Sequence, residues 1–178
     1  MSSPNLTAQA TDLDLIVKVK KYAYLLVTLP SLLLLTSMWL GEQFGHIDTF
    51  SFTTLFFVFI LVPIFDHIIG QDPVNPDEET QVPALSKEVF YRILTLLCLP
   101  LQIASIIYGG HILMTADFSW IGQVGWVLSV GTVGAIVAIN VGHELIHKDP
   151  LIEQWAGGLL FSCVTYGGFK VEHVRGHH

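Results

Sequence analysis

Charged residues are scarce in this sequence. Only 13% of its 178 residues are Asp, Glu, Lys or Arg, about half of the ~25% found in soluble domains. Cysteine is also rare: Cys98 and Cys163 lie in apolar runs, without the paired spacing of a zinc or redox motif. The chain has no block of Lys and Arg of the kind that binds nucleic acid. A disulfide scaffold is therefore not indicated, and no nucleic-acid partner is expected.

Apolar residues are abundant instead, and they make up 52% of the chain. A helix of about 20 apolar residues spans the ~30 Å hydrocarbon core of a bilayer. Four runs are long enough, at residues 22–40, 50–69, 89–113 and 120–142. Pro30, Pro63 and Pro100 fall within them, and membrane helices tolerate proline as a kink. The sequence therefore predicts an all-α integral membrane protein with four transmembrane helices in contact with lipid.

The distribution of basic residues predicts the orientation of these helices. In the four-helix arrangement all 8 Lys and Arg residues fall on one side of the membrane. The loops on the other side, residues 41–49 and 114–119, contain none. Basic loops stay in the cytosol, so the N-terminus is expected there. Residues 1–17 are polar and acidic, unlike a signal peptide; we expect a flexible tail there and a membrane domain over residues 18–178.

A fifth apolar stretch, residues 155–169, is shorter than the ~20 residues of a membrane span and contains four glycines. If it crossed the bilayer, the histidine groups on its two sides would lie about 30 Å apart and could never share a metal. We therefore expect an interfacial helical segment at the cytosolic face.

Histidines form two groups around this segment. In the first, His-Glu-Leu-Ile-His, His143 and His147 are four residues apart and share one face of a helix. The second group contains His173, His177 and His178. If it is helical, His173 and His177 share a face, and His178 points roughly 100° away. One metal held by His143, His147, His173 and His177, with His178 serving a second metal, is the expected arrangement.

The number of histidines favours iron over zinc. Imidazole suits zinc, copper, iron and nickel alike, but a catalytic zinc needs only three protein ligands. Five histidines exceed that number, and an iron centre open to dioxygen fits them better. Nearby carboxylates can orient metal-bound imidazoles through hydrogen bonds. Asp66, Glu144 and Glu172 are the candidates for this role, and solvation of a helix end explains Asp66 equally well.

The two histidine groups also resemble a known family. The segments HELIHK and EHVRGHH, with KVKKYAY, PIFDHIIGQDPVNP and YGGFKVEH, are similar to the N-terminal part of the integral-membrane alkane 1-monooxygenases. These enzymes are relatives of the membrane fatty acid desaturases and hydroxylases. The resemblance implies a six-helix domain in the bacterial inner membrane. It also implies a cytosol-facing di-iron site ligated by His143, His147, His173, His177 and His178.

The resemblance implies a reaction as well: terminal hydroxylation of n-alkanes to 1-alkanols by O₂, with electrons from reduced rubredoxin. The family has a third histidine box, a further single histidine and two more membrane helices, all beyond the region matched here. We therefore expect this chain to be incomplete and inactive by itself.

Three alternatives remain open from the sequence. His143-Glu144-Leu145-Ile146-His147 is a literal HExxH motif, so a membrane zinc metalloprotease with Glu144 as general base is one. Another membrane lipid hydroxylase or desaturase is the second. A metal-binding membrane protein without catalytic activity is the third.

Overall fold

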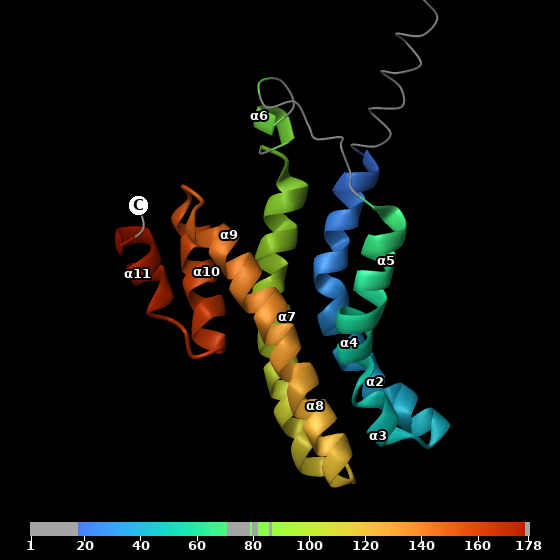
Figure 1. The fold of residues 1–178 in the computed structure, drawn as a ribbon. Helices are drawn as coiled ribbons and strands as arrows, with labels where there is room; N and C mark the ends of the chain where they lie inside the picture. The colour runs from blue at the N-terminus through green and yellow to red at the C-terminus, as the bar shows by residue number, and fades with distance from the viewer. Residues whose placement is uncertain (1–17, 71–78, 80–81, 86, 177–178) are drawn as a thin grey trace, which may run out of the picture.

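Long helices standing side by side make up the structure (Figure 1). The computed structural model describes residues 18–70, 79, 82–85 and 87–176, and every regular element among these residues is a helix. The chain runs alternately down and up through the bundle, and the α2–α3 and α7–α8 connections, which fall within residues 41–49 and 114–119, lie at one end (Figure 1). The expected flexible tail, residues 1–17, lies outside the described residues.

Three helices are long and apolar enough to cross a membrane, each with 27 residues. The first, Lys18–Phe44, includes the 3₁₀ turn η1 (Tyr24–Thr28) and α2 (Leu29–Phe44). The second is α7 (Val89–Thr115). The third, Trp120–Ile146, runs through α8 (Trp120–Val133), the π-helical stretch η3 (Gly134–Val141) and α9 (Gly142–Ile146). The chain is thus a multi-pass membrane protein, and three of the four expected spans are confirmed.

The fourth expected span, residues 50–69, is not confirmed. A turn at Ser51 and Phe52 separates α3 (Ile47–Phe50) from α4 (Thr53–Phe56). From α4 the helix continues through η2 (Phe57–Leu61) into α5 (Val62–Ile69), so that Thr53–Ile69 forms one shorter apolar helix. At 1.5 Å per residue this helix is about 26 Å long, less than the ~30 Å hydrocarbon core. The short helix α6 (Val82–Leu85) follows it.

Two departures from α-helical geometry have a local cause in proline. Proline lacks an N–H group, and its ring clashes with the carbonyl four residues earlier. Relative to Pro30 that carbonyl belongs to Leu26, in η1, and relative to Pro63 it belongs to Phe59, in η2. The π-helical stretch η3 contains no proline.

The core lies where α2, α7, the Trp120–Ile146 helix and α10 (Leu151–Cys163) meet. Its buried apolar residues include Leu34, Cys98, Val137 and Leu160. Trp126 is fully buried, and its indole N–H donates to the carbonyl oxygen of Gly109 across the α7–α8 interface at 2.8 Å. Inside a membrane, lipid is as apolar as the side chains, so helices associate mainly through close packing and through hydrogen bonds of this kind.

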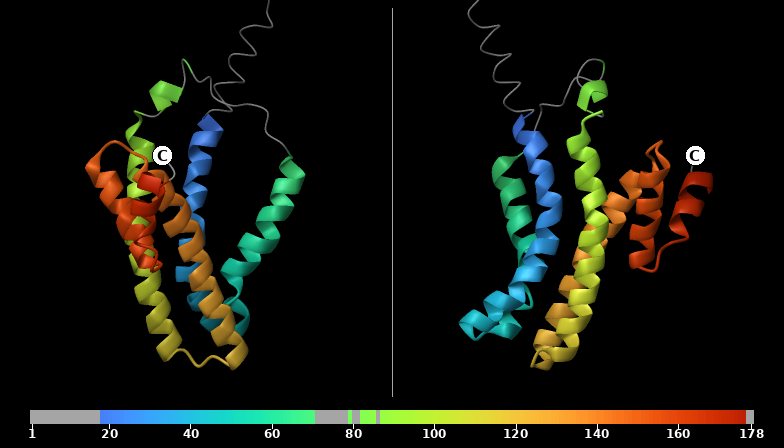
Figure 2. Two further views of the ribbon diagram at one scale, coloured as in Figure 1. Left: turned by 60° about the vertical axis from the view of Figure 1, so that its left-hand side comes forward. Right: turned by 180° about the vertical axis from the view of Figure 1, so that it is seen from behind.

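The segment after α9 reverses twice. The helix α10 runs back beside α9, and α11 (Phe169–Gly176) turns up again next to α10 (Figure 2). Two glycines allow α9 and α10 to approach closely. A Cβ atom on Gly157 would lie only 2.8 Å from the carbonyl oxygen of Gly142 and 3.0 Å from the amide nitrogen of Ile146. The apolar stretch 155–169 therefore does not separate the two histidine groups.

This close approach predicts different effects of alanine at two neighbouring positions. Gly157→Ala would push its methyl group against backbone atoms of α9, which cannot move aside independently. We expect a loss of about 1–3 kcal/mol in stability, measured as a lower Tm of the full-length protein in detergent. At Gly158 the nearest atom, Cδ of Lys170, is 3.6 Å away, so Gly158→Ala should leave the Tm unchanged or higher. Equal Tm values for the two variants would contradict this view of the α9–α10 contact.

Candidate metal centre

Three of the five candidate histidines come together in the structure. His143 lies on α9, His147 caps the C-terminus of α9, and His173 lies on α11. The Nε2 atom of His143 is 2.9 Å from that of His173 and 3.3 Å from that of His147. The Nε2 atoms of His147 and His173 are 3.1 Å apart. Residues from the two sequence groups therefore form a single triangle of ring nitrogens.

This triangle has the dimensions of a metal site. Metal–nitrogen distances of about 2.0–2.1 Å, the values for zinc, place two nitrogens on one ion about 2.9–3.4 Å apart for ligand angles between octahedral and tetrahedral. The three observed distances, from 2.9 to 3.3 Å, fall in that range. A proton on one ring nitrogen can bridge to a neighbouring nitrogen, but it cannot satisfy three converging nitrogens equally. A cation can, so the three histidines fit a metal ion.

The local sequence explains how His143 and His147 are placed. They lie on one face of a helix, while Leu145 and Ile146 are buried on another against the core. The glycine at 142 brings α10 against this helix one residue before His143. The first histidine group is thus held by the packing of its own helix.

An aromatic stack places His173. The ring of Phe169 lies parallel to the His173 imidazole, with centroids 4.9 Å apart and planes 16° apart. Phe169 in turn packs against Phe161 of α10 at 4.8 Å, and Phe161 is completely buried. Phe169 precedes His173 by four residues and so shares its helix face. Sequence reasoning did not assign a role to Phe169, although this spacing could have identified it.

The other candidate residues are not brought to the triangle. His177 and His178 lie outside the described residues. Asp66 lies on α5, which is on the opposite side of the bundle from α10 and α11 (Figures 1 and 2). Glu144 forms an ion pair with Lys148 at 2.5 Å. The orienting role expected of Glu144 and Glu172 stays a prediction.

Cysteine adds no obvious ligand next to this cluster. Cys163 ends α10, and burial raises the pKa of its thiol above the ordinary value. The group of potential metal ligands that the described residues bring together contains only imidazole nitrogens.

Comparisons with known proteins show which proteins this chain is similar to. No protein-family model matches it. It is 48% identical over 171 residues to alkane 1-monooxygenase 2 of Alcanivorax borkumensis, covering 94% of this chain and 44% of that relative. It is 44% identical over 162 residues to alkane 1-monooxygenase 2 of Pseudomonas aeruginosa, covering 90% of this chain and 43% of the relative.

The chain thus spans less than half the length of these curated relatives. Over most of its own length it is homologous to alkane 1-monooxygenases, and the partial coverage agrees with a match to their N-terminal part. The resemblance read from the sequence is confirmed.

The triangle predicts that each of its histidines contributes to metal affinity. We expect His143→Ala and His173→Ala in the full-length protein to weaken Co²⁺ binding by at least tenfold, because each removes one of three converging nitrogens. Titration followed by the visible absorption of bound Co²⁺ would measure this. The matched control is His111→Ala, on α7 and apart from the histidine cluster. Unchanged affinity in both cluster variants would contradict the metal site.

The aromatic stack yields a second prediction. Phe169→Ala should weaken Co²⁺ binding by about tenfold, the effect typical of residues that orient a ligand, because the His173 ring loses its parallel neighbour. Phe169→Tyr keeps a ring in the same place and should bind Co²⁺ nearly as the parent does. If the two variants bound Co²⁺ with equal affinity, the stack would have no part in orienting His173.

Proposed function

We propose that this chain forms the N-terminal part of an alkane 1-monooxygenase that converts n-alkanes to 1-alkanols. The observation that carries the proposal is the convergence of both histidine groups on one point, in a chain 48% identical to such an enzyme over 171 residues. One oxygen atom of O₂ enters the terminal C–H bond, and the other leaves as water with two electrons and two protons consumed. Reduced rubredoxin is the proposed electron donor.

Each histidine of the triangle has a defined task in this proposal. His143, His147 and His173 direct imidazole nitrogens at a common point and would hold iron there, with His177 and His178 completing a di-iron site. When bound, iron supplies the reactivity with dioxygen that an unactivated C–H bond requires and that side chains lack. Phe169 keeps the His173 ring facing the other two.

The location of the site suits an apolar substrate. An alkane dissolves in the hydrocarbon core, and His143 lies near the end of the helix Trp120–Ile146, which is long enough to cross that core. The loops that lack Lys and Arg lie at the opposite end of the bundle from the His147–Leu151 connection (Figure 1). By the positive-inside rule the histidines would then face the cytosol, where rubredoxin is available. We propose the bacterial inner membrane as the location of the protein.

A membrane zinc protease is the main competing function. Three imidazoles also satisfy one catalytic zinc, so the triangle alone does not choose between the metals. Glu144, the general base of that mechanism, is engaged with Lys148 at 2.5 Å. Homology to alkane 1-monooxygenases favours iron. A different lipid as substrate is the remaining possibility within the same chemistry.

Expression of the full-length protein with rubredoxin and its reductase tests the proposal. Membranes supplied with octane, dodecane or hexadecane should form the corresponding 1-alkanol, detected by gas chromatography with mass detection. We expect His143→Ala to abolish the product and His111→Ala to retain it, because only His143 belongs to the triangle. Purified protein that contains zinc without iron, and that forms no alcohol, would overturn the proposal in favour of the protease.

A further inference from the structure

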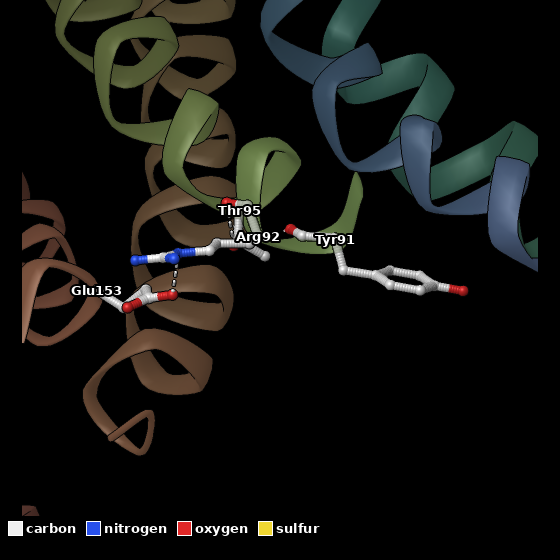
Figure 3. Close-up of polar contacts among 4 residues, drawn as sticks. All are labelled: Tyr91, Arg92, Thr95 and Glu153. Carbon is white, nitrogen blue, oxygen red and sulfur yellow. Dashed lines mark hydrogen bonds and ion pairs between the residues drawn. The ribbon is translucent and has the colours of Figure 1, made fainter. Parts of the chain in front are cut away.

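A charged contact joins α7 to α10 close to the histidines. Nε of Arg92 lies 2.8 Å from Oε1 of Glu153, and Figure 3 shows the Arg92 side chain reaching Glu153 while Tyr91 points away. The two partners differ in burial: the Glu153 side chain is 7% exposed, and that of Arg92 is 51% exposed. The second carboxylate oxygen, Oε2, is buried and has no hydrogen-bond partner among the described residues. Glu153 therefore depends on Arg92 for its counter-charge.

The first turn of α10, where Glu153 lies, is a junction between the elements that carry the ligands. The side-chain amide of the next residue, Gln154, donates to the carbonyl of Lys148 at 3.0 Å, directly after His147. The backbone carbonyl of Gln154 accepts from the Lys170 ammonium of α11 at 3.1 Å. A shift of this turn would therefore move both the backbone that follows His147 and the helix α11, which carries His173.

We propose that the Arg92–Glu153 ion pair is a positioning device for the metal centre, which rests on the proposed metal-binding function. Arg92 fixes the first turn of α10 to α7, and this turn sets the distance of His173 from His143 and His147. Neither residue belongs to the group of His143, His147 and His173, so both act through the placement of α10. Glu153 received no role from the sequence, where a glutamate at the start of an interfacial helix resembles a solvated residue.

The unequal burial gives the proposal a sharp test. Arg92→Met leaves a buried carboxylate without a counter-charge, which strongly destabilises the present position of the turn. Glu153→Gln removes the buried charge and leaves an arginine that water can solvate. The double variant Arg92→Met/Glu153→Gln has no buried charge to expose. Disruption should therefore be greatest in the Arg92→Met single variant and smaller in the double variant.

The measurement is Co²⁺ affinity of the full-length protein in detergent, together with the visible ligand-field spectrum of the bound ion. We expect Arg92→Met to weaken binding by about tenfold and to alter the spectrum. The double variant should recover most of the affinity. Arg92→Lys, which keeps the charge, should resemble the parent. The control Lys87→Met removes an exposed positive charge just before the same helix and should change neither property.

Two results would overturn the role of the ion pair. One is parental affinity and spectrum in Arg92→Met accompanied only by a lower Tm, which would make the contact merely stabilising. The other is equal weakening in Arg92→Met and the double variant. If the parent bound no Co²⁺ at all, the proposed metal centre would fail and this inference with it. If the parent protein bound Co²⁺ as expected but oxidised no alkane, that result would count against the proposed function alone.

Discussion

The close approach of α10 to α9 at Gly142 and Gly157 is the contact on which the arrangement of the histidines depends. Inside a bilayer, burying an apolar helix face against another helix gains little over contact with lipid, so small residues that let backbones approach carry more of the attraction. Gly157 has Gly142 and Ile146 backbone atoms within 3.0 Å of where a Cβ would be. The helix α11 packs on α10 and α9, so His173 can reach the first histidine group only because α10 lies this close.

Much of the helical architecture could be predicted from the sequence, because run length and the bilayer thickness determine it together. The three confirmed spans follow from this constraint. The interruption of residues 50–69 could not be predicted, because its cause lies far along the chain. The backbone N–H of Ser119 donates to Asp48 at 3.0 Å, and the hydroxyl of Ser129 donates to the carbonyl of Ser51 at 2.7 Å. These contacts hold the turn that ends α3.

Some residues of the candidate site could be predicted from the sequence, and others could not. His143 and His147 are four residues apart, so their proximity follows from helix geometry. His173 was predicted to join them because both histidine groups must lie on one side of the membrane to share a metal. Asp66 shows the limit of that reasoning. Hydropathy assigns a residue to one end of the bundle but carries no information on which neighbouring helices it faces. The helix α5 lies on the opposite side of the bundle from α10 and α11 (Figures 1 and 2). The Arg92–Glu153 pair also joins distant segments, so neither sequence neighbourhood indicates it.

The polar contacts of α10 are better understood as determinants of position than as sources of stability. A helix of 13 residues is marginal by itself, and a buried ion pair often contributes little net stability, because desolvation offsets the attraction. What such a pair does enforce is geometry: a carboxylate as buried as Glu153 has few places where its charge is compensated. Contacts from α7 and α11 to Glu153 and Gln154 restrict α10 to one placement. A metal centre assembled from separate helices needs that restriction more than it needs added stability, because small displacements of one helix change every distance to the ligands on the other.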